Sequence, residues 1–271
     1  MPELPEVETT LRGIAPHIVG KSIKNAVVRC EKLRWPIPQD LPEILRKRKV
    51  LAVERRGKYL IIKFNHGALI LHLGMSGNLR IVSKRSAAKK HDHVDWELNS
   101  GQILRFTDPR RFGAVLWTTD SAENHKLLST LGPEPLSEDF NGELLFQQSR
   151  KRKVSIKSFI MDSHIVVGVG NIYANEALFL SGIRPSKPAG KVSRAKHALL
   201  SEQIKEVLGK AISAGGTTLK DFVGSDGKPG YFKQQLFVYG RAGQACVICE
   251  QTLKEIRISQ RSTVYCSHCQ G

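Results

Sequence analysis

The sequence lacks any long apolar run: no stretch approaches the ~18 consecutive apolar residues that a membrane-spanning helix needs. Its acidic start also lacks the basic and apolar regions of a secretory signal peptide. No internal repeat or low-complexity tract is present, which argues against repeat and fibrous architectures. We therefore expect a soluble, intracellular protein.

Acidic residues are few compared with basic ones: 25 Asp and Glu stand against 42 Lys and Arg, leaving a formal net charge of +17 and a pI near 9.8. This imbalance predicts a polyanionic partner, most often nucleic acid, although charge alone does not separate DNA from RNA or from an anionic membrane. The basic residues gather at positions 80–90, 110–111 and 150–153. The first group is typical of a solvated loop, whereas the last precedes an apolar stretch and suits a phosphate track.

Cysteine is scarce, with five in the chain. Cys30 lies in a strand-like stretch and is expected to be an ordinary small core residue. The other four form two Cys-x2-Cys pairs separated by sixteen residues, the spacing of a tetrahedral structural zinc site: Cys246, Cys249, Cys266 and Cys269. A redox pair or disulfides are the alternative, but an intracellular protein keeps such thiols reduced. We expect one structural zinc ion per chain, with His268 on the surface because sulfur already fills the four coordination positions.

The chain is long enough for two domains, with 271 residues and 41% hydrophobic content. Residues 5–19 place Val7, Leu11, Ile14 and Ile18 at helical spacing, which predicts an amphipathic helix. From residue 23 to 117 the pattern changes to short β-rich runs, which predicts a β-sandwich or barrel. The expected strands cover 50–53, 59–64, 68–73, 78–82, 93–98, 102–107 and 114–117.

A Gly- and Pro-rich segment at residues 131–136 breaks this pattern and marks a domain boundary, after which the sequence is helical. One helix is predicted over 171–181, and Ser193 can cap a second helix that ends at Gly215-Gly216. Two helices across a turn fit a DNA-binding element, although a plain helical hairpin satisfies the same pattern. The part from residue 235 alternates like a β-hairpin and carries the four paired cysteines.

The residues directly after Met1 could form a catalytic unit. Removal of Met1 would leave Pro2 with a free secondary amine beside the carboxylate of Glu3. An α-amino group titrates near 7.7–8.0, so a useful fraction is nucleophilic at neutral pH. Condensation with a sugar C1′ would give an iminium cation, and Glu3 could act as proton donor or base. The alternative is a frayed chain start or simply the first turn of a helix.

Further segments carry groups suited to a phosphate backbone. Lys58 stands before an apolar strand, where an ammonium suits a phosphate but is more often a surface charge. Met75 lies between glycines in a turn, where it either projects or is partly buried. Residues 108–113 join a turn, two arginines and Phe112, which could act as a wedge in a base stack. Asn171 opens a helix behind flexible glycines, and Arg261 lies in the cysteine hairpin within reach of a phosphate.

Taken together, these segments resemble the formamidopyrimidine-DNA glycosylases, a family that removes oxidised purines from DNA. Nearly the whole chain carries the family's motifs in order: the Pro-Glu-Leu-Pro-Glu start, Arg-Gly-Lys-Tyr, His-Leu-Gly-Met-Ser-Gly, Asp-Pro-Arg-Arg-Phe-Gly, Gly-Val-Gly-Asn-Ile-Tyr, Gly-Gly-Thr-Thr-Leu-Lys-Asp-Phe and the four-cysteine finger. The resemblance implies an α+β multidomain fold. Residues 1–131 would form a catalytic two-layer β-sandwich with flanking helices, 132–234 a helix-two-turns-helix domain with a lesion-capping loop at 217–231, and 235–271 a β-hairpin zinc finger.

The resemblance also implies the chemistry. Pro2 would attack C1′ of a damaged nucleotide flipped out of the duplex, and Glu3 would assist base departure by proton transfer at the sugar. β- and then δ-elimination would follow, with Lys58 as proton donor near the phosphate and Arg261 gripping phosphates at the lesion. Glu6 matches a further acidic residue near the nucleophile.

Other positions match the family's contacts with DNA. Met75, Arg110 and Phe112 would fill the gap left by the flipped nucleotide and probe the opposite base. Backbone contacts are expected from His91, Lys153 and Asn171. The partner would be double-stranded DNA with oxidised purines or abasic sites, bound by a monomer in the cytoplasm of a bacterial-type cell, at the nucleoid.

Two other functions stay open at the level of sequence. An endonuclease VIII-like enzyme shares the fold and amine chemistry but prefers oxidised pyrimidines, and the start and the Arg110-Arg111-Phe112 tip favour the purine enzyme. A non-catalytic zinc-finger protein that binds nicked or damaged DNA would keep Met1, whereas processing to Pro2 would weaken that alternative.

Overall fold

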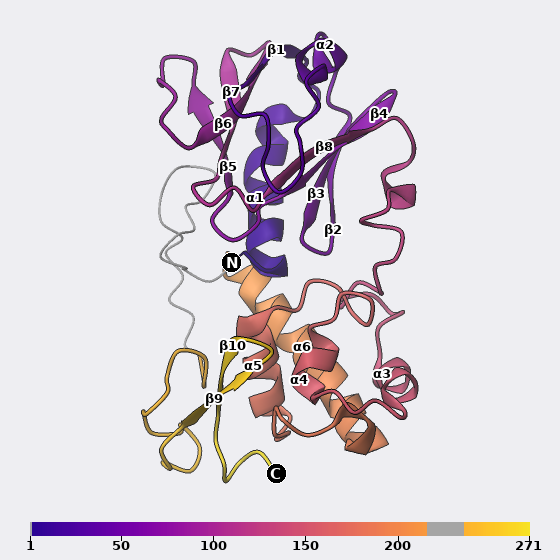
Figure 1. Cartoon of the computed structure of the whole chain (residues 1–271), viewed down its shortest axis with the longest axis vertical. Coiled ribbons are helices and arrows are strands. Elements are labelled where there is room, and N and C mark those ends of the chain that lie inside the picture. Colours follow the sequence, from indigo (N-terminus) through magenta and orange to yellow (C-terminus); the bar gives the residue numbers. More distant parts are fainter. Residues whose placement is uncertain (1, 216–235) are drawn as a thin grey trace. The chain divides into compact units, whose positions relative to one another are not determined.

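The computed structural model describes residues 2–215 and 236–271. Of these, residues 2–129, with 214 and 215, belong to one compact unit, and residues 130–213 with 236–271 belong to the other. Figure 1 shows the elements of both units coloured along the sequence. We call them unit 1 and unit 2.

Unit 1 is a β-sandwich with helix α1 (Leu4–Ile18) and the short helix α2 (Leu41–Leu45) packed on it. Its strands form two antiparallel four-stranded sheets, ordered β1-β6-β7-β5 and β2-β3-β4-β8. Helix α1 contacts β2 and β3 of one sheet and β5 of the other, so it spans the two layers. The strands are β1 (Ile23–Val28), β2 (Ala52–Arg56), β3 (Tyr59–Phe64), β4 (Gly67–His72), β5 (Asn78–Ser83), β6 (Asp92–Leu98), β7 (Gln102–Thr107) and β8 (Ala114–Thr118), with a 3-10 turn at Ala122–Asn124.

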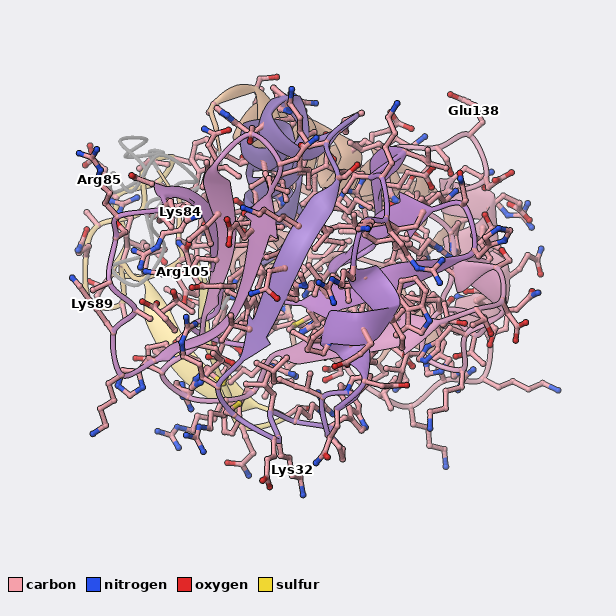
Figure 2. The ribbon with its side chains drawn as sticks, turned by 90° about the horizontal axis from the view of Figure 1, so that it is seen from above. Lys32, Lys84, Arg85, Lys89, Arg105 and Glu138 are labelled. Atoms are coloured by element: carbon pink, nitrogen blue, oxygen red, sulfur yellow. The ribbon has the colours of Figure 1, made fainter. Side chains whose placement is uncertain are left out.

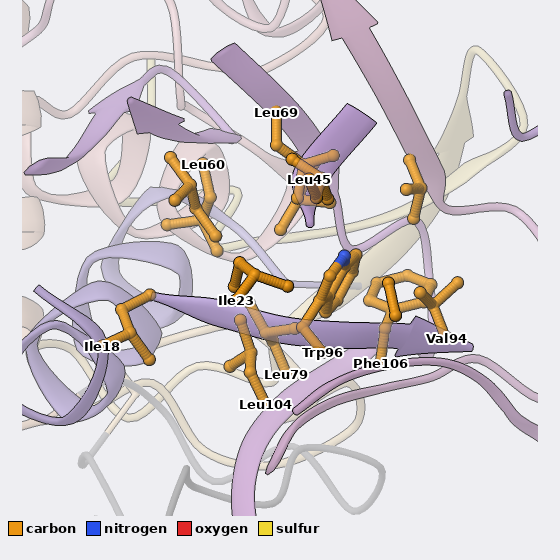
Figure 3. Close-up of a cluster of buried hydrophobic side chains, with 14 of the residues drawn as sticks. Ile18, Ile23, Leu45, Leu60, Leu69, Leu79, Val94, Trp96, Leu104 and Phe106 are labelled. Atoms are coloured by element: carbon orange, nitrogen blue, oxygen red, sulfur yellow. The ribbon is translucent and has the colours of Figure 1, made fainter. Parts of the chain in front are cut away.

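One apolar core joins both sheets of unit 1 to the helices. Trp96 and Phe106 are its largest fully buried members and come from neighbouring strands β6 and β7 (Figure 3). Leu60 and Leu69 supply the other sheet, and Ile18 supplies α1. Because each strand alternates its side chains between two faces, the residues of this core lie on one face of each sheet.

The predicted elements of unit 1 are found with small shifts. The first helix begins one residue earlier than the pattern suggested, and the strand expected at 50–53 runs instead from Ala52 to Arg56. The expectation for Cys30 is met only in part, because it packs against the core but not from a strand. Strand β1 ends at Val28, so Cys30 lies beyond it and is half-buried at the edge of the core.

Unit 2 is built on two helices that pack against each other, the largely buried α5 (Asn171–Leu180) and α6 (Arg194–Ser213), of which one face is buried. The hydroxyl of Ser193 accepts from the N–H of Lys196 at 3.3 Å, as a capping residue does. Helix α3 (Gly142–Ser149) packs against α6, and Gly142 permits the approach because a Cβ there would lie 2.3 Å from Cα of Ala198. The remaining helical segments are α4 (Ile156–Ile160) and a 3-10 turn at Ala189–Lys191.

The end of the chain forms an antiparallel hairpin of β9 (Lys254–Ile258) and β10 (Arg261–Tyr265). Its two turn residues, Ser259 and Gln260, have φ of 48° and 62°. Two consecutive left-handed residues make a tight turn whose twist suits a hairpin. Within the part of the chain that the structure describes, no helix is long and apolar enough to cross a membrane.

Candidate DNA-lesion site

The start of α1 holds the candidate nucleophile and its acid in a buried place. Pro2 and Glu3 are both buried, with the Glu3 residue 2% exposed. Glu3 is the N-cap, and the carboxylate of Glu6 accepts from its backbone N–H at 2.8 Å. The Glu3 side chain accepts in return from the Glu6 backbone, which completes a capping box. The helix cap therefore fixes both carboxylates next to Pro2, and the described segment from Pro2 onward is not frayed.

Lys58 lies at the two-residue turn between β2 and β3, where Gly57 adopts φ of 56°. The strand before this turn is tied to α1, because the Arg55 guanidinium contacts the Glu8 carboxylate at 2.9 Å. Burial acts to raise the pKa of Glu8, but Arg55 and Arg12 lower it. The turn that carries Lys58 is thus braced on the helix that begins beside Pro2.

The charge of Lys58 also reaches the adjacent strand. Tyr59 pairs with His72 across β3 and β4, and their ring centroids are 4.8 Å apart. Burial lowers the pKa of His72 to about 4, with further lowering from Lys58 and Arg34. The ring is therefore neutral at physiological pH, and its Nδ1 accepts from the Gly74 N–H at 3.0 Å.

Two loops meet beyond Gly74 and present the candidate wedge. A Cβ at Gly74 would lie 2.5 Å from the backbone carbon of Phe112, so only glycine permits this contact. Met75 is 37% exposed and Phe112 is 47% exposed, both unusually high for large apolar side chains. The Arg110 guanidinium lies 4.9 Å from the Phe112 ring centroid, a cation–π distance.

Asp108 joins these two loops through its buried carboxylate. Oδ1 accepts from the Ser76 hydroxyl at 2.9 Å and from the Arg110 N–H at 3.3 Å, and Oδ2 accepts from the Gly113 N–H at 2.7 Å. Its own N–H donates to the carbonyl of His91 at 3.0 Å. One carboxylate therefore sets the positions of the wedge loops, and its backbone fixes the half-buried His91 beside them.

In unit 2, Asn171 stands at the first turn of α5 behind Gly170 and donates to the carbonyl of Ser262 at 3.1 Å. Lys157, which is 1% exposed, donates to the same carbonyl at 3.0 Å and to the Thr263 hydroxyl at 2.7 Å. These bonds hold the start of β10, where the exposed Arg261 follows the turn. Lys153 is exposed in the segment before α4.

The four paired cysteines form a single cluster. Their sulfur atoms all lie within 4.8 Å of one another, with Cys246 and Cys269 3.9 Å apart and Cys249 and Cys266 3.4 Å apart. Tetrahedral zinc with Zn–S bonds near 2.3 Å needs S···S separations of about 3.8 Å. The geometry fits one zinc ion and confirms the zinc prediction from the spacing.

Electrostatics also favour a metal here. Burial acts to raise the pKa of Cys266, but the N–H groups of Cys269 and His268 and the Cys249 thiol lower it to about 7. Burial and the three neighbouring thiols raise the pKa of Cys269. Four thiolates cannot share this space unless a cation neutralises them, and zinc supplies that charge.

Glu176 is a buried group that the sequence did not single out. Its carboxylate accepts from the backbone N–H groups of Phe237, Val238 and Tyr239 at 2.6, 3.0 and 2.8 Å. Burial raises the pKa of Glu176 against the lowering effect of these bonds. The carboxylate thereby fixes the chain to α5 directly after residue 235.

The structure thus groups the predicted site residues by unit. Unit 1 contains Pro2, Glu3, Glu6, Lys58, Met75, His91, Arg110 and Phe112, and unit 2 contains Lys153, Asn171, Arg261 and the four cysteines. The predicted lesion-capping loop at 217–231 lies outside the described residues. Sequence reasoning missed Asp108, Lys157 and Glu176 as organisers. Asp108 opens a segment already singled out for its arginines and could have been found there, whereas nothing in the pattern distinguishes a buried Lys157 or Glu176 from a surface charge.

Three family models match successive parts of the chain. The formamidopyrimidine-DNA glycosylase N-terminal domain matches residues 1–115, the formamidopyrimidine-DNA glycosylase H2TH domain matches 131–223, and the zinc finger found in FPG and IleRS matches 243–271. A formamidopyrimidine-DNA glycosylase of Stutzerimonas stutzeri is 60% identical over 270 residues and one of Pseudomonas entomophila is 59% identical, each match covering 100% of both chains.

Solved structures resemble the chain over its whole length. The MutM (Fpg) protein of Thermus thermophilus has 34% identity and a TM-score of 0.88, covering 99% of this chain and 98% of that one. Lactococcus lactis Fpg in complex with abasic-site DNA has 33% identity and a TM-score of 0.92, covering 99% of both chains. The wild-type L. lactis protein with DNA containing N7-benzyl-Fapy-dG has 34% identity, a TM-score of 0.91 and 99% coverage of both chains.

Proposed function

Because the chain belongs to the formamidopyrimidine-DNA glycosylase family, we propose that Pro2, Glu3, Lys58 and Arg261 carry out its reaction on DNA. The chain is a base-excision repair enzyme that acts as a glycosylase on oxidised purines in duplex DNA and as an AP lyase. The observation that carries the assignment of residues is the buried capping box at the start of α1, which holds the Glu3 carboxylate beside Pro2. Removal of Met1 frees the Pro2 amine.

Pro2 begins the reaction as the nucleophile. Its nitrogen forms a bond to C1′ of the flipped nucleotide while the bond from C1′ to the base breaks. The oxidised base leaves with the electron pair of that bond and takes up the proton that the Pro2 nitrogen loses. Glu3 then gives a proton to O4′ as the C1′–O4′ bond breaks, and the nitrogen lone pair forms the C1′=N bond. The product is an iminium between Pro2 and C1′, with no N–H proton to lose.

The iminium makes the C2′ proton acidic and so drives strand cleavage. Loss of that proton expels the 3′ phosphate by β-elimination, and a further proton loss at C4′ expels the 5′ phosphate by δ-elimination. Each departing phosphate benefits from a nearby cation. We assign Lys58, braced beside α1, to one phosphate and Arg261, at the hairpin turn, to the other.

DNA engagement divides between wedge and backbone contacts. Met75, Arg110 and Phe112 fill the gap left by the extruded nucleotide. Their exposure supports this role, and so does the Asp108 carboxylate, which holds the loops that carry them. His91, Lys153 and Asn171 bind backbone phosphates. Glu6 acts through the capping box that orients Glu3.

The remaining assignments concern the organisation of the chain. Residues 1–131 form the catalytic domain, 132–234 the helix-two-turns-helix domain and 235–271 the zinc finger. Zinc is structural, because four sulfur ligands leave no position for a reactant. The protein acts as a monomer in the cytoplasm, at the nucleoid.

Borohydride trapping tests the nucleophile. With duplex DNA containing 8-oxoguanine opposite cytosine, the reductant should fix a covalent adduct, and the trapped peptide should begin at Pro2. Only an iminium can be reduced to a stable link, so a glycosylase that activates water leaves nothing to trap. An adduct on Lys58 or another lysine would contradict the assignment.

Glu3→Gln tests the acid, with Glu123→Gln on an exposed surface as the matched control. Glu3→Gln should retain the fold and lesion binding while base excision falls by roughly 10²–10⁴-fold, the usual contribution of a positioned acid or base. The control should excise at the normal rate. Normal excision by Glu3→Gln would remove Glu3 from the mechanism.

A further inference from the structure

The loop at residues 84–90 joins β5 to β6 and is exposed along its whole length. Three of its cations, Arg85, Lys89 and Lys90, form no ion pair with any carboxylate in the described residues, whereas Lys84 contacts Glu97 at 2.9 Å. Figure 2 shows Lys84, Arg85 and Lys89 along this loop, with Arg105 on the strand beside it. Three unneutralised cations in seven residues are a strong local positive charge.

The loop is nevertheless bound to the sandwich through Arg105 of β7, whose side chain is 3% exposed. One side of the guanidinium contacts Asp95, with Nε–Oδ1 and Nη2–Oδ2 distances of 2.8 Å. The other donors point into the loop: Nη2 donates to the carbonyl of Ser86 at 3.0 Å, and Nη1 to the carbonyl of Ala87 at 3.1 Å. A buried guanidinium thus binds two backbone carbonyls of an exposed segment.

Asp92 holds the other end of the loop. Its Oδ2 accepts from the Lys89 N–H at 2.8 Å, and its own N–H donates to the Lys89 carbonyl at 3.0 Å. The same carboxylate lies 3.4 Å from Arg105. The two ion pairs and the loop therefore form one network.

These hydrogen bonds distinguish residues 84–90 from a disordered solvated loop, which would not be anchored by buried side chains. Bringing charges out of water is unfavourable unless they are paired and hydrogen-bonded, and here Arg105 uses its remaining donors on the loop backbone. A loop held in one conformation loses little entropy when its side chains bind a ligand. The next residue, His91, is fixed to Asp108 by a 3.0 Å bond, so the loop continues directly into the lesion site.

We propose that Arg105 is a positioning residue which holds residues 84–90 as an additional phosphate-binding surface for duplex DNA. Arg85, Lys89 and Lys90 contact the phosphates, and Arg105 contacts none. The choice of DNA as ligand rests on the proposed function, but the surface is tested on undamaged duplex, where no base is excised.

Salt dependence of binding tests the surface. Each phosphate contact contributes a slope of about 0.9 in log K against log salt, or roughly tenfold in affinity at 0.1 M salt. The triple substitution R85S/K89S/K90S should therefore reduce the slope by about 2.7 and weaken binding by several hundredfold, roughly, at 0.1 M salt. The charge-matched control K21S/K47S/K49S removes three exposed cations elsewhere in unit 1 and should change the slope by less than about 0.9. Equal changes in both proteins would overturn the surface, because binding would then follow net charge alone.

A double-mutant cycle tests the role of Arg105. Arg105→Lys keeps the charge but loses the forked donors. In the wild-type background, the dissociation constant for duplex DNA should therefore rise about tenfold, which corresponds to the loss of one phosphate contact. In the triple variant, it should rise less than about threefold. Arg29→Lys is the matched control, since Arg29 contacts the same Asp95 at 2.8 Å and, within the described residues, reaches no carbonyl of the loop. Its dissociation constant should stay within about threefold. A loss from Arg105→Lys that is equal in both backgrounds, or that Arg29→Lys reproduces, would overturn the positioning role.

Hydrogen exchange on the unaltered protein keeps the inference testable if Arg105→Lys fails to fold. The amides of Ser86 and Lys89, which bond to Ser83 and Asp92, should exchange more than roughly tenfold slower than in a free peptide. Exchange at the free rate would show an unanchored loop and overturn the proposal. A failure of borohydride trapping, by contrast, would remove Pro2 as the nucleophile and leave the binding results unchanged.

Discussion

Asp108→Asn is the substitution that most directly tests how the wedge is built. The Asp108 residue is fully buried, and its two oxygens accept three hydrogen bonds from the loops that carry Met75, Arg110 and Phe112. Asparagine has the same shape but only one acceptor oxygen. Whichever way the amide turns, its NH₂ group faces a backbone donor: the Gly113 N–H on one side, or the Arg110 N–H on the other.

The magnitude follows from the bonds involved. A hydrogen bond to a charged group contributes about 1.5–3 kcal/mol, roughly twice a neutral one, and an unsatisfied buried donor costs about 1–3 kcal/mol. Asp108→Asn loses at least one bond outright and the charge on the others. We therefore expect the free energy of unfolding of unit 1 to fall by about 2–4 kcal/mol.

Tryptophan fluorescence reports this unit selectively, because the chain's three tryptophans, Trp35, Trp96 and Trp117, all belong to it. The urea midpoint of the fluorescence transition should fall for Asp108→Asn with little change in slope. Asp120→Asn, at an exposed position, is the matched control and should leave the midpoint unchanged. A shift in midpoint no larger than that of the control would refute the reasoning.

The same substitution should separate lesion recognition from general affinity. Binding to undamaged duplex depends on cations spread over the chain and should change by less than about threefold. The preference for a lesion-containing duplex should fall at least about tenfold, because Met75 and Phe112 no longer project together. An unchanged preference would show that the wedge loops do not need Asp108.

The sequence predicts the parts of this molecule that repeat or pair at fixed spacing. The short apolar runs of β3 and β4 and the 3.6-residue period of α1 are local properties, so all three elements lie within one residue of their predicted bounds. The cysteine cluster follows from spacing alone because a tetrahedral metal site requires two closely spaced pairs. The site residues follow from the family motifs, because the local pattern alone does not distinguish most of them from ordinary surface or turn residues.

Groups that act through long-range contacts were not predictable. Arg105 sits in an alternating strand where an arginine is normally exposed, and only the sheet register places it between Asp92 and Asp95. Lys157 bonds to residues more than a hundred positions away, so its burial is a property of the tertiary fold. The strand-like stretch at residues 26–30 predicts Cys30 within a strand, but β1 ends at Val28 and Cys30 lies partly buried against the core.

Three further measurements test zinc, the anchor on α5 and the buried ion pairs. Cys249→Ser should lower the zinc content, measured by elemental analysis, below one atom per chain and should weaken DNA binding. The fluorescence transition of unit 1 should stay unchanged. Full DNA binding by metal-free protein would contradict a structural role for zinc. Glu176→Gln places an NH₂ group against one of three backbone donors, so the amides of Val238 and Tyr239 should exchange faster with solvent. The control Glu202→Gln, at an exposed position, should leave their exchange unchanged. Amides that stay protected in Glu176→Gln would rule out the anchor. Burial acts to raise the pKa of Asp95, but Arg105 and Arg29 lower it below its usual value. A carboxyl whose folded pKa is depressed stabilises the protein above its unfolded pKa of about 3.9 and loses that contribution as pH falls through the lower folded value. The free energy of unfolding of unit 1 should therefore decline more steeply below about pH 4 in the wild type than in D95N, which cannot titrate there, and parallel declines would show that this ion pair contributes nothing to acid stability.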